Sequence, residues 1–207
     1  ARSQVKHVVI DMNANYSSIV RELFPNAKII IDRFHTVQLA GRALDTVRIQ
    51  CIRKLSADKR SREYKILKSH WRLLHKYSAN LERQKRRYLY GLNEYMTQAE
   101  AINLVFNRFP NLEQIWNIYQ QILAAIRTRN ALLLVEIFNI KPKNLPDEAV
   151  VLIKTLKKNI KGISESCDSP YSNGPLEGLN RKIKQISRSG YGYRNLANFF
   201  NRIRLEL

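Results

Sequence analysis

Three acidic residues stand in positions that suit ligands for a metal ion. Asp11 closes the apolar run HVVID, Asp32 closes the apolar run KIIID, and Glu177 lies in the segment SNGPLEGLNRKIK. Carboxylate oxygens are the ligands that Mg²⁺ and Mn²⁺ prefer. These ions activate water and stabilise the leaving oxygen in phosphoryl transfer. The three acids therefore favour metal-assisted phosphoryl transfer, with Asp11 and Glu177 as metal ligands.

The two aspartates are expected at the ends of two parallel strands. The segment between them, NANYSSIVRELFPNA, has its apolar residues at helical spacing and predicts a strand, a helix and a second strand. Ligands of such units gather at the carboxyl ends of the strands, which is where Asp11 and Asp32 stand. We therefore expect both carboxylates to face one crevice.

Two further polar residues follow Asp32 in the sequence DRFH. His35 could orient a carboxylate, hydrogen-bond the scissile phosphate or support a metal ligand. Alternatively, Asp32 and His35 cap the strand and the next helix, since an Asp at a strand end is more often a cap than a ligand. Arg33 is either a phosphate contact or a solvated side chain. These alternatives stay open for Asp32 and His35.

Glu177 is expected in the first turn of a helix that starts near Pro175. Arg181, Lys184 and Arg188 follow Glu177 on the same helical face. Alternatively, this is an ordinary exposed face with an ion pair between Glu177 and Arg181 worth about 0.3–0.5 kcal/mol. That alternative explains the cations but not the position of the acid. We expect these three cations, together with Arg33 and Arg194, to contact DNA phosphates. The opposite face is predicted to be buried and carries Leu176, Leu179, Ile183 and Ile186.

The charge of the chain points to a polyanionic partner. Its 207 residues include 36 Lys and Arg against 17 Asp and Glu, a net charge of +19, and nucleic acid is the polyanion that such a surface fits best. No apolar run reaches membrane-spanning length and no signal peptide opens the chain, so we expect no membrane contact and a cytoplasmic location. Cys51 and Cys167 lack metal or disulfide spacing and are expected to be reduced.

Three regions are expected along the chain. Residues 1–35 form the strand–helix–strand unit, residues 36–165 form a helical region with no convincing strand, and residues 166–207 form the closing helices. Within the helical region, Pro110 divides two helices, and Gly162 is expected to end a helix near residue 161. Among the tyrosines, Tyr88 and Tyr90 are expected to pack, although they lie among cations that would suit stacking on bases.

Two long segments resemble a known family. They are VVIDMNANYSSIVRELFPNAKIIIDRFHTVQLAGRALDTVR and SNGPLEGLNRKIKQISRSGYGYRNLANFFNRI, and both are similar to DDE-type transposases of bacterial insertion sequences, in particular the ISL-three group. The resemblance covers both ends of the chain, and the middle only in general character. It implies an α/β fold, predominantly α by residue count, in which a partial ribonuclease-H-like core is interrupted by a large helical insertion.

The resemblance also implies roles for the acids. The family uses an Asp, Asp, Glu triad, in which Asp11 matches the second acid, Glu177 the third, and Asp32 with His35 a D-x-x-H signature. No candidate for the first acid remains, so the chain reads as a carboxyl-terminal fragment that is nearly inactive alone. A competing alignment makes Asp11 and Asp32 the first two acids.

The family further implies an activity and partners. The activity is cleavage of DNA at the element ends and transfer of the cut strands to target DNA. It uses two Mg²⁺ or Mn²⁺ ions and is carried out by a homodimer or higher oligomer. The alternative is a noncatalytic, basic helical module that binds nucleic acid and uses its acids as caps or ion-pair partners.

Overall fold

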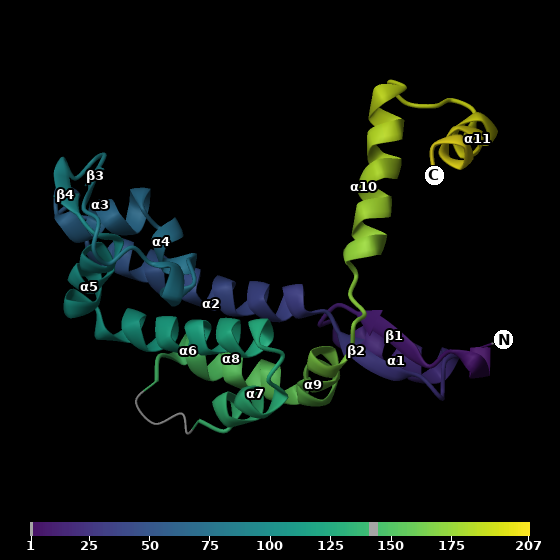
Figure 1. Ribbon diagram of the computed structural model, residues 1–207, viewed down its shortest axis with the longest axis horizontal. Helices are drawn as coiled ribbons and strands as arrows, with labels where there is room; N and C mark the ends of the chain where they lie inside the picture. The colour runs from purple at the N-terminus through teal and green to yellow at the C-terminus, as the bar shows by residue number, and fades with distance from the viewer. Residues whose placement is uncertain (1, 141–144) are drawn as a thin grey trace. The chain divides into compact units, whose positions relative to one another are not determined.

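The computed structural model describes residues 2–140 and 145–207. It divides into two compact units, Ala1–Pro170 and Tyr171–Leu207, called unit 1 and unit 2 below. Most of the described residues are helical (Figure 1), as the sequence predicts. None of the described helices is both long and apolar enough to cross a membrane.

Unit 1 begins with a strand–helix–strand unit. Its elements are β1 (His7–Ile10), α1 (Ala14–Leu23) and β2 (Lys28–Ile31), preceded by a short 3-10 turn, Arg2–Gln4. β1 and β2 are parallel, with His7 opposite Lys28 and Ile10 opposite Ile31. Asn13 begins α1, because its side chain accepts a hydrogen bond from the backbone N–H of Asn15. The two apolar runs therefore form the predicted parallel pair, whereas a partial ribonuclease-H-like core stays a prediction.

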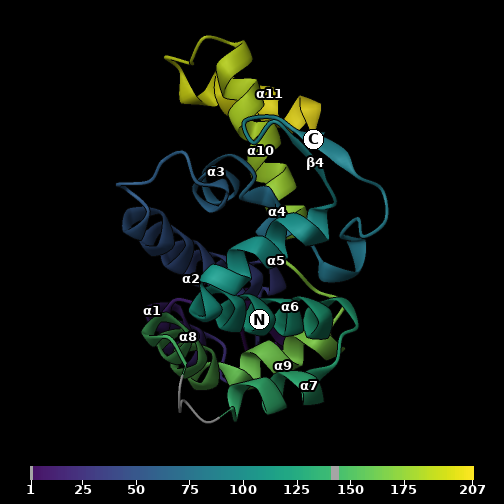
Figure 2. The same ribbon diagram turned by 90° about the vertical axis from the view of Figure 1, so that its left-hand side faces the viewer.

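The rest of unit 1 is a helical body around one hydrophobic core. Its helices are α2 (Arg33–Lys54), α3 (Arg62–Ser69), α4 (Arg72–His75), α5 (Gln98–Arg108), α6 (Pro110–Arg127), α7 (Ala131–Phe138), α8 (Asp147–Lys158) and α9 (Ile160–Asp168), with a 3-10 turn at Ser78–Asn80. α2 and α6 pack side by side, and α7, α8 and α9 lie below them (Figure 1, Figure 2). Ala40, Leu44, Val47 and Cys51 form the buried face of α2. Pro110 starts α6, as predicted.

The expectation that residues 36–165 contain no strand is wrong for one short segment. β3 (Arg87–Leu89) and β4 (Glu94–Met96) form an antiparallel hairpin between α4 and α5. The sequence RYLYGLNEYM is rich in tyrosine, which is enriched in strands, and Gly91 takes the positive φ of 88° that the turn needs. From the sequence alone, the Tyr and Leu residues of this segment also fit a helical period, which favours an amphipathic helix.

The end of the helical region also differs from the prediction. Gly162 lies inside α9 instead of ending a helix, and residues 163–168 are also helical. The reason is packing, because α9 lies against β2 and a Cβ on Gly162 would stand 2.6 Å from Cγ1 of Ile31. The glycine therefore permits a close approach of helix and strand.

Unit 2 consists of two helices. They are α10 (Gly174–Ser189) and α11 (Leu196–Glu206), and Lys182 of α10 donates a hydrogen bond to the carbonyl oxygen of Glu206. The predicted buried face of α10 is found only in part. Ile186 is buried, but the side chains of Leu176 and Leu179 are 58% and 39% exposed, because α11 reaches only part of that face.

Both cysteines are buried in unit 1. Burial raises the pKa of the Cys51 thiol to about 11, and burial together with the charge of Asp168 raises the pKa of Cys167. Since the thiolate is the reactive form, we expect iodoacetamide at pH 8 to label Cys51 on the order of 100-fold more slowly in the native chain than in urea. Mass spectrometry of timed samples measures both rates. Equal rates with and without urea would contradict this burial.

Candidate active site

A contact between a histidine and an aspartate joins the end of β1 to the start of α2. Nε2 of His35 lies 2.8 Å from Oδ1 of Asp11, and the two side chains are 23% and 46% exposed. Asp11 follows β1 directly, and the ring of Phe34 packs edge-on against the His35 ring. His35 therefore contacts Asp11, whereas the sequence alone left its partner open. The pair holds a carboxylate at the carboxyl end of the parallel strands, with one side facing solvent.

Asp32 lies at the carboxyl end of β2 and is buried, with 5% of its surface exposed. Its Oδ1 accepts a hydrogen bond of 2.8 Å from the backbone N–H of Phe34, so Asp32 is the N-cap of α2. The backbone N–H of Asp32 also donates to the carbonyl of Ile10, at the end of β1. Asp32 thus fixes the direction in which α2 leaves the strands. A catalytic role for Asp32 stays a prediction.

The Asp11 carboxylate opens into a pocket of about 230 Å³. Gln38 and Arg42 of α2 line it, three and seven residues after His35, and therefore share one helical face with that histidine. This spacing is visible in the sequence, but neither residue was singled out there. Arg42 places a cation near the acid. The other residues that line the pocket are Met12, Asn13, Tyr16, Leu39 and Thr155.

Arg33 contacts the backbone of unit 1. Its Nη1 donates hydrogen bonds of 2.5 Å and 3.0 Å to the carbonyl oxygens of Ser166 and Ser169. These carbonyls belong to the last turn of α9 and to its C-cap, where a cation is stabilising. The guanidinium thus ties α9 to the start of α2. A phosphate contact by Arg33 stays a prediction.

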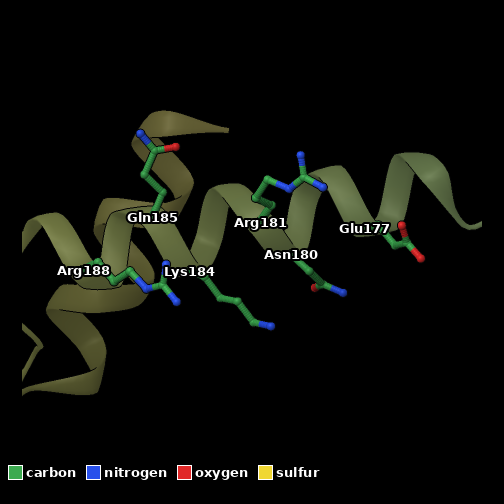
Figure 3. A pocket seen from close by; sticks show the side chains of 6 residues that line it. All are labelled: Glu177, Asn180, Arg181, Lys184, Gln185 and Arg188. Atoms are coloured by element: carbon green, nitrogen blue, oxygen red, sulfur yellow. The ribbon is translucent and has the colours of Figure 1, made fainter. Parts of the chain in front are cut away.

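The third acid and most of the candidate DNA contacts lie on α10 in unit 2. A groove of about 610 Å³ runs along this helix, and Figure 3 shows the side chains that line it. Among them, Glu177 lies nearest the N-terminus of α10. The residues are Glu177, Asn180, Arg181, Lys184, Gln185 and Arg188. All are exposed, so the predicted face of one acid and three cations is accessible from solvent.

Arg194 lies in the turn between α10 and α11 and is exposed. In the same turn, Gly192 has a φ of 91°, and the ring of Tyr193 packs against Phe199 at 5.1 Å. The Tyr191 side chain is fully exposed. Tyr193 therefore packs, whereas Tyr191 faces solvent.

The donor atoms of unit 1 fit one side of a divalent-metal site. They are the carboxylate of Asp11 and, beside it, the imidazole of His35, and an oxygen donor of this kind suits Mg²⁺ or Mn²⁺. Across residues 2–140 and 145–207, no three His, Cys, Asp or Glu side chains gather closely enough to hold a metal ion. Asp11 and Glu177 belong to different units, so their convergence on one ion is a proposal.

Comparisons with known proteins give the family. The family model for DDE transposases of the ISL-three group, described as "Transposase", matches residues 1–203. The chain is 30% identical over 209 residues to the transposase for insertion sequence element IS1001 of Bordetella parapertussis. The aligned region covers 99% of this chain and 48% of that protein. A protein of Lactococcus lactis subsp. lactis named ATP-dependent protease is 31% identical over 114 residues, covering 54% of this chain and 36% of that protein.

The chain thus spans less than half the length of these two relatives. No solved structure matches it significantly. The family match runs through Asp11 and the DRFH segment at one end and through α10 at the other. Since it covers almost every residue, the chain belongs to the ISL-three group of DDE transposases.

Proposed function

We propose that this chain forms part of a catalytic domain that cleaves DNA at the ends of a transposable element and joins them to target DNA. In cleavage, a water oxygen bonds to phosphorus and the bond to the 3′ oxygen breaks, which leaves a 3′ hydroxyl. In transfer, that hydroxyl attacks a target phosphorus and displaces the target 3′ oxygen. The observation that carries the proposal is the Asp11–His35 pair at the carboxyl ends of β1 and β2, in a chain of this family.

Asp11 and Glu177 are the proposed metal ligands. When bound, Mg²⁺ or Mn²⁺ supplies a Lewis acid that activates the attacking oxygen and stabilises the leaving one. The complete enzyme would hold two such ions. His35 holds the Asp11 carboxylate in one orientation through its 2.8 Å contact. Asp32 supports the site by capping α2, the helix that carries His35.

The cations on α10 are the proposed contacts to DNA, both at the element ends and at the target. Arg181, Lys184 and Arg188 lie along one exposed groove, and Arg194 follows in the next turn. Each phosphate that these side chains neutralise releases counterions, so affinity should fall steeply with salt. We further propose a homodimer or higher oligomer as the active complex and the cytoplasm as its location.

Iron-mediated cleavage of the chain tests the metal site without requiring DNA chemistry. Fe²⁺ replaces Mg²⁺ in such sites, and with ascorbate and peroxide it generates radicals that cut the nearby backbone. We expect cuts near residues 11 and 177 that excess Mg²⁺ suppresses and that Asp11→Asn removes. Asp58→Asn, at an exposed loop position, is the matched control and should leave both cuts in place.

The outcomes of this test separate the two functional readings. Cuts near both residues that depend on Asp11 support a metal site shared by units 1 and 2. A cut near residue 11 alone would remove Glu177 from the set of ligands. If Asp11→Asn leaves the pattern unchanged while the chain still binds DNA, the noncatalytic binding module is the better reading.

A further inference from the structure

The outer face of the β3–β4 hairpin carries three exposed tyrosines. The side chains of Tyr88, Tyr90 and Tyr95 are 38%, 80% and 68% exposed. Tyr88 and Tyr95 are directly opposite each other in the two strands, and Tyr90 opens the turn. The expectation that Tyr88 and Tyr90 pack is therefore wrong for Tyr90, because strand alternation turns Leu89 inward and its neighbours outward.

The hairpin is held firmly by its inner face. Met96 is buried and Leu89 packs against the hydrophobic core. Nε2 of His70, at the end of α3, lies 2.8 Å from the carbonyl oxygen of Tyr90 and fixes the turn. The hydroxyl of Tyr88 donates to Oδ1 of Asn93 at 3.1 Å. The exposed tyrosines thus stand on an ordered support, which lowers the entropy lost when a partner binds.

The tyrosine rings form one aromatic surface. The Tyr88 ring lies 5.2 Å from that of Tyr90 and 5.3 Å from that of Tyr95, both edge-on. Cross-strand contact between aromatic residues stabilises hairpins, and this accounts for the pairing of Tyr88 with Tyr95. It does not account for Tyr90, which lies beyond the strand and leaves most of its ring in solvent. A ring in that position is available to a ligand.

The charges around the hairpin complement a polyanion. Arg83, Lys85 and Arg87 are exposed, and none of them forms a salt bridge within the described ranges. Nearby acids are already engaged. Glu94 pairs with Arg62 at 2.5 Å and Glu100 pairs with Arg86 at 2.7 Å, while Glu82 accepts hydrogen bonds from the backbone of the basic loop and lies near Arg87.

We propose that the β3–β4 hairpin binds unpaired bases of a DNA strand. The rings of Tyr90 and Tyr95 stack on bases, while Arg83, Lys85 and Arg87 hold the phosphates beside them. Stacking on aromatic side chains next to a positive track is the general mode of single-strand recognition, and every base offers a face for it. The proposal rests on the proposed function in one respect, since both require DNA as the partner.

The hairpin lies near the carboxyl end of α2 (Figure 1), whereas His35 lies in the first turn of the same helix. α2 spans the distance between them with 22 residues, a length of roughly 33 Å at 1.5 Å per residue. This length corresponds to about one turn of a DNA duplex. A strand cut at Asp11 would therefore meet the tyrosines about one helical turn away, in a segment that is open or distorted.

The experiment measures binding of the full 207-residue chain to two fluorescent DNAs. One is a blunt duplex, and the other is the same duplex with an internal unpaired stretch that carries 2-aminopurine, whose emission is quenched on stacking. We expect wild type to bind both and to quench the probe. The double variant Tyr90→Ala with Tyr95→Ala removes two stacks and should bind the open DNA about 30-fold more weakly or worse, with the quenching lost. Its affinity for the blunt duplex should not change.

Two control variants keep the result interpretable. The double variant Tyr90→Phe with Tyr95→Phe keeps the rings and should bind and quench like wild type. Leu132→Ala removes an exposed apolar side chain from α7 and should change neither affinity. Circular dichroism of the alanine variant shows whether the fold is intact, and if it is not, the single variant Tyr90→Ala replaces it.

Each contrary result has a separate meaning. If wild type binds neither DNA, the proposed function fails together with the hairpin proposal. If wild type binds both DNAs and the alanine variant does the same with the probe still quenched, only the hairpin proposal is overturned. An alanine variant that binds both DNAs normally but no longer self-associates in sedimentation would assign the tyrosines to a protein interface, which also overturns it.

Discussion

Asp11→Ala should abolish strand cleavage by a transposase that carries this sequence, while DNA binding persists. Asp11 supplies the partly exposed carboxylate that His35 orients at the end of β1. Loss of a metal-holding carboxylate removes several kcal/mol of transition-state stabilisation, so the rate should fall about 1,000-fold or more. Gel analysis of labelled element ends in Mg²⁺ measures cleavage, and a mobility shift on the same DNA measures binding.

Variants of other residues should reduce cleavage to different extents. Glu177→Ala should match Asp11→Ala, because both are proposed to hold the ion. His35→Gln should cost less, about 10- to 100-fold, since His35 is proposed to act by orienting Asp11. Asp58→Ala at an exposed loop position should cleave at the rate of wild type. Normal cleavage by both Asp11→Ala and Glu177→Ala would remove these acids from the chemistry.

Leu44→Ala should cause the largest loss of stability among these substitutions. Leu44 is completely buried on the face of α2 that packs against α6. Removing a buried leucine side chain leaves a cavity that the surrounding core fills only in part, which lowers the free energy of unfolding by about 3–5 kcal/mol. The midpoint of thermal unfolding should fall by roughly 10 °C. Circular dichroism on heating, together with urea titration, measures both changes.

Ile49→Ala is the matched control on the same helix. The Ile49 side chain is 41% exposed, so its truncation leaves no cavity and should lower stability far less. Both variants lose the same kind of contact and differ only in burial. Equal losses from the two variants would mean that the α2–α6 contact does not form the centre of the core.

Much of the fold around the site could be predicted from the sequence, because it depends on local sequence patterns. The runs HVVI and KIII are short and rich in β-branched residues, which favours strands, and an aspartate follows each run, so β1, β2 and the positions of Asp11 and Asp32 could be predicted from the sequence. Pro110 similarly marked the start of α6. The Asp11–His35 contact was not predictable, because it depends on how α2 leaves β2.

The predictions failed where tertiary packing decides between two local patterns. RYLYGLNEYM fits both a helix and a hairpin, and the hairpin forms because Leu89 and Met96 reach the core from alternate positions. Gly162 has the character of a helix end, but its missing Cβ permits the contact of α9 with Ile31. In each case the deciding atoms come from a distant part of the chain.

The hydrogen bonds of Arg33 have a consequence for the order of folding. They join Arg33 to Ser166 and Ser169, residues 133 and 136 positions away, and α9 covers β2 across a similar separation. Contacts between such distant residues require closure of a long loop and form slowly, whereas neighbouring helices of the body meet through shorter loops. We therefore expect the helical body to fold before α9 docks, with β2 uncovered until that body has brought the two ends of the loop together.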